Sequence, residues 1–184
     1  MYVMRPATTD DRAAYTELIR ARAAWMVSTG KVGGADLLEE DRAEQIAAQA
    51  GNGRTPVWAL LSPEAELIGC TSLYDQTPAW GWTDAERAEP ALFLATTFTH
   101  PDHRATKPGT LIAWWALAHA VSTGKLWVRR GCGHQGLVRY YRDHQGFDLI
   151  HETERGGHPA YLLARKAEEL NHLPVTTDPT GTFT

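Results

Sequence analysis

LFLATTFTHPDHRATKPGTLIAWWALAHAVST, residues 92–123, is the stretch that decides the fold. It begins with apolar and β-branched residues that predict a strand, breaks at a polar turn with Pro101 and Gly109, and continues as an apolar run that predicts a helix. A loop that opens into a helix N-terminus presents unpartnered backbone N–H groups at the positive end of the helix dipole, which favours a bound phosphate. The turn carries positive and polar side chains: His100, His103, Arg104, Thr106, Lys107 and Thr110.

The length and composition indicate one ordinary globular domain. The chain has 184 residues, of which 43% are hydrophobic and 22% charged, and this is enough for one well-buried core. Its formal net charge of −4 at pH 7 argues against broad nucleic-acid binding, which needs an excess of basic side chains on one face. A local basic pocket is compatible with this charge.

Cysteine use and hydropathy predict a cytoplasmic protein without a membrane segment. Cys70 and Cys132 are far apart and have no metal-ligand spacing, so we expect neither a disulfide framework nor a metal site. No apolar run approaches the ~18 residues of a membrane span. The N-terminal MYVMRPATTDD also lacks the basic and then apolar pattern of a signal peptide.

Strand and helix patterns alternate on both sides of the opening stretch, which predicts an α/β (α+β) fold. We expect one domain over residues 1–168, with a mixed, mostly antiparallel central sheet of about six to seven strands flanked by helices. Residues 169–184 are expected to form a flexible tail, because they are rich in threonine and contain few apolar residues. The patterns before the opening stretch predict a strand at 2–6, a helix through Tyr15–Met26, a second helix at 36–50, a hairpin within 55–75 and a loop at 76–90.

Three local sequences resemble the Gcn5-related N-acetyltransferases (the GNAT family), mixed α/β enzymes that move an acyl group from coenzyme A to an amine. THPDHRATKPGTLIAWWALAHA, residues 99–120, is similar to the family's strand, Arg/Gln-x-x-Gly-x-Gly/Ala loop and helix, which hold the coenzyme A pyrophosphate. Arg104 stands at the first motif position and Gly109 at the last. RPATTDD near the N-terminus and LVRYYRDHQGF before the closing hairpin resemble two further family segments.

The resemblance implies an acetyl-coenzyme A-dependent N-acetyltransferase that acts on a primary amine of a small molecule or peptide by direct attack in a ternary complex. Two residues depart from the family's loop: Lys107 stands at the first glycine, and Pro108 removes one backbone donor. The implied cofactor-binding residues are Phe98, Thr99, Arg104, Ala105, Thr106, Lys107, Gly109 and Thr110.

Amide formation from a thioester needs a base for the amine. Many family relatives place a glutamate on the strand before the loop, but the matching residues 94–97 contain no carboxylate. Asp75, at the end of the preceding strand, is therefore the first candidate base, and Glu89, His100 and His134 are the alternatives.

The leaving thiolate needs a proton, and the resemblance assigns its donation to Tyr141. Tyr140 is the alternative, because neighbouring helical residues point about 100° apart and only one of the two tyrosines can face the thiolate. Cys132 lies close to His134, but no third group orients them, so a nucleophilic cysteine is not expected. Arg129 and Arg130 are expected to be surface charges at a strand end, with contact to the cofactor as the alternative.

The predicted loop at 76–90 carries Trp80 and Trp82, which either line the acceptor site or pack on the core as a lid. Together with the nearby acids Asp84, Glu86 and Glu89 they suggest a cationic amine acceptor. A homodimer is left open. The functional alternatives are a non-catalytic acyl-coenzyme A-binding regulatory module and an acyltransferase for a longer acyl chain.

Overall fold

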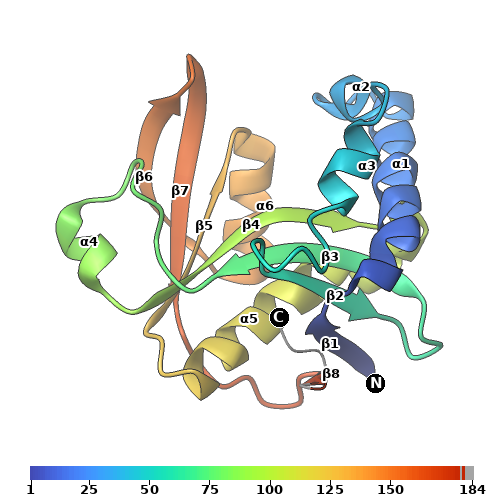
Figure 1. Ribbon diagram of the computed structural model, residues 1–184. Helices are drawn as coiled ribbons and strands as arrows, with labels where there is room; N and C mark the ends of the chain where they lie inside the picture. The colour runs from blue at the N-terminus through green and yellow to red at the C-terminus, as the bar shows by residue number, and fades with distance from the viewer. Residues whose placement is uncertain (179, 181–184) are drawn as a thin grey trace. The chain divides into compact units, whose positions relative to one another are not determined.

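The computed structural model describes residues 1–178 and 180 (Figure 1), and their contacts group them into two compact units. Unit 1 comprises Met1–Ser72, Thr96–Ile112 and the described residues from Pro174 onward. Unit 2 comprises Leu73–Ala95 and Ala113–Leu173. Strand β4 (Ala91–Thr99) begins in unit 2 and ends in unit 1, and helix α5 (Pro108–Ser122) runs from unit 1 into unit 2.

Unit 1 orders its strands β3-β2-β1-β8. Antiparallel pairing joins β1 to β2 and β2 to β3, as the predicted hairpin requires. Helices α1, α2 and α3 lie side by side in Figure 1. Apolar side chains of α1 and α3 pack on β2 and β3. The elements are β1 (Tyr2–Pro6), the 3₁₀ helix η1 (Thr9–Asp11), α1 (Arg12–Ser28), α2 (Gly34–Leu37), α3 (Arg42–Ala47), β2 (Val57–Leu61) and β3 (Leu67–Tyr74).

The second predicted helix, at 36–50, is divided in the structure. Helix α2 ends at Leu37 and α3 begins at Arg42, and between them Asp41 adopts a left-handed conformation with φ 60°. Aspartate tolerates this conformation better than most residues because its short side chain hydrogen-bonds locally. The apolar spacing of Ala43, Ile46 and Ala47 nevertheless marks the buried face correctly.

Part of the predicted tail is a strand. Val175–Thr177 form β8, which pairs in parallel with β1, and Asp178 N–H donates to Met4 O over 2.9 Å. Three β-branched residues suit an extended backbone, and an open strand edge offers them hydrogen-bond partners. The threonine-rich composition concealed this short strand, and residues 179 and 181–184 of the predicted tail lie outside the described part of the chain.

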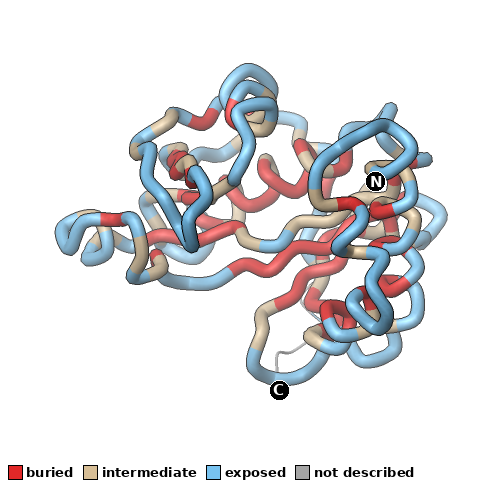
Figure 2. Tube along the Cα trace, turned by 90° about the horizontal axis from the view of Figure 1, so that it is seen from above, coloured by how far each residue is buried: buried red, intermediate tan, exposed pale blue. Residues whose placement is uncertain are grey.

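Unit 2 orders its strands β6-β7-β5-β4, with β4 parallel to β5 and the other pairs antiparallel. The buried strand residues of unit 2, drawn red like the other buried residues in Figure 2, belong to β4, β5 and β7, whereas no residue of β6 is buried. Helix α4 was not predicted within the loop at 76–90, although Thr83 and Glu86 form the capping box that starts it. The remaining elements are α4 (Asp84–Ala88), β5 (Trp127–Cys132), α6 (Gln135–Gln145), β6 (Asp148–Arg155) and β7 (His158–Lys166).

The α/β class and the mixed, mostly antiparallel pairing are confirmed. The strand count is eight over the described residues, above the expected six to seven, and β8 is the strand that the sequence patterns missed. None of the helices in the described ranges is long and apolar enough to cross a bilayer.

Candidate functional site

The predicted anion-binding loop is a 3₁₀ helix followed directly by an α-helix. Pro101–Thr106 form the 3₁₀ helix η2, and α5 begins at Pro108. Proline is suited to the first position of a helix, where its missing N–H would have had no intrahelical acceptor. The missing N–H of Pro108 therefore costs the anion site less than the position of this proline in the family motif implied.

Lys107 makes the turn between η2 and α5 in a left-handed conformation, with φ 52° and ψ 58°. Glycine adopts this conformation freely, whereas other residues pay a steric cost of about 1–2 kcal/mol. Lys107 stands where the family motif has its first glycine, and its left-handed conformation is one that glycine adopts without this cost. Its carbonyl accepts hydrogen bonds from Thr110 N–H at 2.9 Å and Leu111 N–H at 3.2 Å, which starts the helix.

The predicted cofactor-binding residues all lie in unit 1 on one continuous run of chain. Arg104 and Lys107 are exposed, whereas Thr110 in the first turn of α5 is only 3% exposed. The Arg104 guanidinium donates one hydrogen bond to Pro101 O at 3.1 Å. Its position over η2 leaves the rest of an exposed, permanently charged fork available for an anion.

Within strand β4, Thr96 has a φ of 41°. A positive φ at a β-branched residue is a conformational outlier, and such outliers gather at functional sites. Pairing of β4 with β5 covers Ala91–Leu94 and stops before this residue. Beyond it lie Phe98 and Thr99, the two β4 residues predicted to bind the cofactor, and both are half-buried.

The two histidines of the loop have local partners. His100 Nδ1 accepts a hydrogen bond from Asp102 N–H at 3.3 Å, and His103 Nε2 lies 3.5 Å from a Glu66 carboxylate oxygen. His100 is therefore a cap of η2 in this structure. In the described ranges no group of His, Cys, Asp or Glu side chains is arranged to hold a metal ion.

In unit 2, Tyr141 lies on α6 with a buried arginine against its ring. The Arg130 guanidinium carbon is 3.4 Å from the centre of the Tyr141 ring and 5.6 Å from that of Phe147. Arg130 is 4% exposed and donates to Gln145 Oε1 at 2.7 Å. Tyr141 is thereby held against β5. The ring centre of Tyr140 lies 5.2 Å from that of His144 on the same helix.

Arg129, the neighbour of Arg130 on β5, lies against the segment that contains α4. It is 2% exposed and donates to Thr77 Oγ1, Glu86 O and the Glu89 carboxylate. Its guanidinium also lies 4.9 Å from the Trp82 ring centre. The expectation that Arg129 and Arg130 are surface charges is therefore wrong, because side-chain alternation along β5 sends each of them into a different packed layer.

The two tryptophans predicted to bind the acceptor differ in burial. Trp82 is 6% exposed and packs with Phe93, Leu162 and Ala164, as the core alternative requires. Trp80 is half-buried, and the Arg155 guanidinium lies 4.2 Å from its ring centre. Each ring therefore already has a cation of the chain itself on it.

The acids near these tryptophans are also paired within the chain. Glu89 binds Arg129, Asp84 binds Arg87 at 3.3 Å, and the Glu86 carboxylate lies 2.8 Å from His151 Nε2. Burial raises the pKa of Glu86, but hydrogen bonds from Thr83 and the neighbouring His151 outweigh it and lower the pKa. The acidic cluster thus stabilises α4, and Glu89 is an ion-pair partner of Arg129 more than a candidate base.

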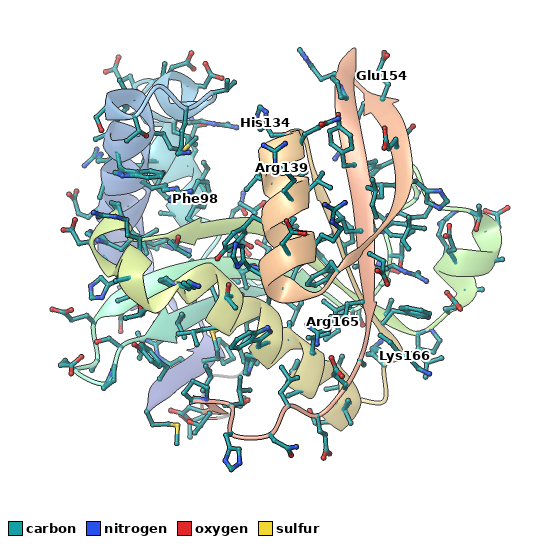
Figure 3. The ribbon with its side chains drawn as sticks, turned by 180° about the vertical axis from the view of Figure 1, so that it is seen from behind. Phe98, His134, Arg139, Glu154, Arg165 and Lys166 are labelled. Atoms are coloured by element: carbon teal, nitrogen blue, oxygen red, sulfur yellow. The ribbon has the colours of Figure 1, made fainter. Side chains whose placement is uncertain are left out.

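Asp75 is exposed directly after β3, and its backbone carbonyl accepts from Lys125 Nζ at 2.9 Å. His134 is exposed at the N-terminal end of α6, near Arg139 (Figure 3). Burial raises the pKa of Cys132, although a backbone hydrogen bond and the charge of Arg130 act against it. A thiol kept protonated is a poor nucleophile, which agrees with the sequence-based view of Cys132.

Sequence reasoning missed Arg130 and Gln145 as parts of this region. A signal was present, since side chains alternate along a strand and Arg130 therefore shares a face with the apolar Val128. Gln145 immediately precedes Gly146, which ends α6 with φ 70°. A side chain at Gly146 would meet Arg165, which donates to Gln145 O, so this turn is fixed by a close approach.

Comparison with known proteins places the fold. No protein-family model matches the sequence, and no curated protein is similar to it. Among solved structures, a GNAT-family acetyltransferase from Listeria monocytogenes has a TM-score of 0.68 at 16% identity, covering 90% of this chain and 94% of its own. A GNAT-family acetyltransferase from Streptococcus agalactiae has a TM-score of 0.66 at 13% identity, covering 91% and 96%.

A third similar structure, the PaiA N-acetyltransferase from Thermoplasma acidophilum in complex with coenzyme A, has a TM-score of 0.61 at 15% identity and covers 90% of this chain and 99% of its own. At these identities the likeness concerns the fold. The chain has the fold of GNAT-family acetyltransferases, as the sequence resemblance implied.

Proposed function

We propose that the chain is an N-acetyltransferase that transfers an acetyl group from acetyl-coenzyme A to a primary amine of a small molecule or peptide. The observation that carries the proposal is the left-handed turn at Lys107, which leads from η2 into α5. A left-handed turn before a helix N-terminus is open to a glycine, so its presence at Lys107 supports a loop of this kind although the motif glycine is absent. A coenzyme A complex of the same fold adds support.

The residues of the loop fit a pyrophosphate. Arg104 and Lys107 bring exposed positive charge to the N-terminus of α5, where the helix dipole also favours an anion. Thr110 adds a hydroxyl in the first turn. We assign the phosphate groups to these side chains and the pantetheine arm to Phe98 and Thr99 on β4, with Ala105, Thr106 and Gly109 completing the loop.

Acetyl-coenzyme A, when bound, supplies the thioester whose acetyl group is transferred. Tyr141 Oη gives a proton to the leaving thiolate sulfur, a role that its position against Arg130 supports. Asp75 accepts the proton of the amine, directly or through water, and its exposure after β3 keeps it accessible. Trp80 contributes to the acceptor site, and Trp82 supports it from the core. With the acids near α4 already paired, nothing restricts the acceptor to a cationic amine.

The experiment is cofactor binding followed by thiol release. Millimolar coenzyme A should raise the melting temperature, because a ligand that binds the folded state stabilises it. Free coenzyme A should then appear when acetyl-coenzyme A and a library of amines are added. In the test variant, Arg104→Gln with Lys107→Gln, both the thermal shift and the thiol release should weaken. The matched control is Arg87→Gln, at an exposed site in α4, which should leave both responses unchanged.

Two outcomes would contradict this function. Absence of any protection by coenzyme A would remove both the transferase and the alternative, a non-catalytic acyl-coenzyme A-binding regulatory module. Protection without thiol release on any amine would favour the regulatory module, whose supporting observation is the lack of a carboxylate on β4.

A further inference from the structure

Arg130 is a buried cation without an acidic partner within the described part of the chain. It is 4% exposed, its hydrogen bond goes to the neutral amide of Gln145, and its Nε has no acceptor. Burying a charge is costly unless an opposite charge compensates it. Arg129, next to it, has such compensation from Glu89. The contrast indicates that Arg130 is kept for something other than an ion pair.

Two aromatic faces take the place of the missing acid. Phe147, 5.6 Å from the guanidinium, can contribute packing and a ring quadrupole only. Tyr141, at 3.4 Å, carries a hydroxyl that can also lose a proton. A buried positive charge this close attracts a phenolate far more strongly than a neutral phenol, because the protein interior screens charges less than water does.

We propose that Arg130 is a positioning residue that acts through Tyr141, stabilising the negative charge that forms on this tyrosine when it donates its proton. The inference rests on the proposed function. In the step, the Tyr141 O–H bond breaks, an S–H bond forms on the leaving thiol, and the electron pair stays on the phenol oxygen. The phenol regains its proton from water or, through water, from Asp75, which has taken the proton of the acceptor amine. Arg130 keeps its own protons throughout.

Gln145 completes the arrangement by holding the guanidinium without neutralising it. A glutamine oxygen accepts the hydrogen bond as a carboxylate would, but adds no charge. Gln145 is 1% exposed, and its backbone carbonyl is itself held by Arg165 at the end of β7 (Figure 3). On α6 the other ionisable side chains are Arg139, Tyr140, Arg142, Asp143 and His144. The strands β5, β6 and β7 add Arg129, Cys132, Asp148, His151, Glu152, Glu154, Arg155, His158, Tyr161, Arg165 and Lys166.

The first test is a double-mutant cycle between Arg130 and Tyr141. Arg130→Gln should lower kcat about tenfold or more, in the range of general-acid effects, with the KM for acetyl-coenzyme A within about twofold, since the loss concerns the transition state. Arg130→Lys should restore part of kcat. In a Tyr141→Phe background, Arg130→Gln should have no further effect. Additive losses in the cycle would overturn the proposal, because a purely structural arginine acts independently of the phenol hydroxyl.

The second test adds a counter-charge and leaves Arg130 in place. Gln145→Glu gives the guanidinium a carboxylate partner of the same shape, so the fold should be at least as stable while kcat falls. If Arg130 had only a structural role, Gln145→Glu should leave kcat unchanged or raise it. That result would overturn the proposal even if Arg130→Gln failed to fold.

The third test needs neither cofactor nor turnover. The ultraviolet absorbance of the Tyr141 phenolate is obtained by subtracting the alkaline titration curve of a Tyr141→Phe variant from that of the same protein with Tyr141 in place. This difference should appear at higher pH in Arg130→Gln than in the unsubstituted protein, with Arg130→Lys in between. Coincident titrations would overturn the inference. If coenzyme A neither binds nor is released, the proposed function fails while this titration still reports on the Arg130–Tyr141 contact.

Discussion

Positive charge is used in two different ways in the two units of this protein. In unit 1, Arg104 and Lys107 are exposed on the loop before α5. In unit 2, Arg129 and Arg130 are buried on β5. Exposed charges are free to meet a ligand but are screened by salt, whereas buried charges must be satisfied by the fold and act on fixed neighbours. In the proposed function, basic side chains thus serve ligand capture in one place and local electrostatics in the other.

The two buried arginines also differ from each other. Arg129 has a carboxylate, a hydroxyl and a backbone carbonyl as acceptors, which tie the α4 segment to β5. Arg130 has one neutral acceptor and two ring faces. A charge with matched partners indicates a structural role. A charge with unmatched partners indicates that its field is used elsewhere, and four substitutions or conditions test this division.

The largest effect is expected from Arg129→Met. The substitution removes the guanidinium that donates hydrogen bonds to the buried Thr77 hydroxyl and to the Glu86 carbonyl. The free energy of unfolding should therefore fall by about 2–3 kcal/mol. Urea unfolding measures it, and Arg87→Met on the exposed face of α4 should change stability by less than about 0.5 kcal/mol. A loss below about 1 kcal/mol for Arg129→Met would mean that this arginine does not anchor the α4 segment.

The next effect is that of Gln145→Leu, which leaves the Arg130 guanidinium without its one acceptor. Unfolding free energy should fall by about 2 kcal/mol. Adding Arg130→Met should return most of this stability, because an apolar pair of similar volume replaces a buried polar pair at little cost. If Arg130 serves Tyr141, the double variant should regain stability but show the lowered kcat expected of Arg130→Gln. No recovery of stability would place Arg130 in the same structural class as Arg129.

A smaller effect of the opposite sign is expected from Lys107→Gly in the exposed region. Glycine relieves the left-handed strain at φ 52°, and after its extra chain entropy is counted the gain in unfolding free energy is about 0.5–1 kcal/mol. Coenzyme A affinity should fall with the lost charge. Lys107→Ala is the matched control, since it removes the charge and keeps the strain. Equal stability of the two variants would show that the turn is not strained.

The smallest effect is the salt response that separates exposed from buried charge. The Kd for coenzyme A should rise several-fold between about 0.05 and about 0.3 M NaCl, because the Debye length shrinks over this range. The Arg104→Gln, Lys107→Gln variant should show a flatter response. The kcat ratio of wild type to Arg130→Gln should not change with salt. A salt-dependent ratio would mean that Arg130 is reached by ions and belongs with the exposed group.

The comparison also shows where prediction from the sequence succeeded. The strand, turn and helix of residues 92–123 were predicted because apolar periodicity and turn residues are local signals. The α/β class with mixed pairing followed from the order of the elements. Helix α4 and strand β8 were missed, since each is short and lies in a polar or threonine-rich segment whose order depends on partners distant in the chain.

The sequence alone determined the order of the longer strands and helices, the loop with its positive residues and the pair of tyrosines on α6, because these depend on neighbours along the chain. Only the tertiary structure decided that Lys107 makes a left-handed turn, that Trp82 is core, and that Arg130 lies on the Tyr141 ring. Burial and stacking join residues of β5 and α6 whose contact no local pattern specifies. The physical reason is that burial, neighbouring charges and hydrogen bonds determine what a charged side chain does, and only the fold determines these surroundings.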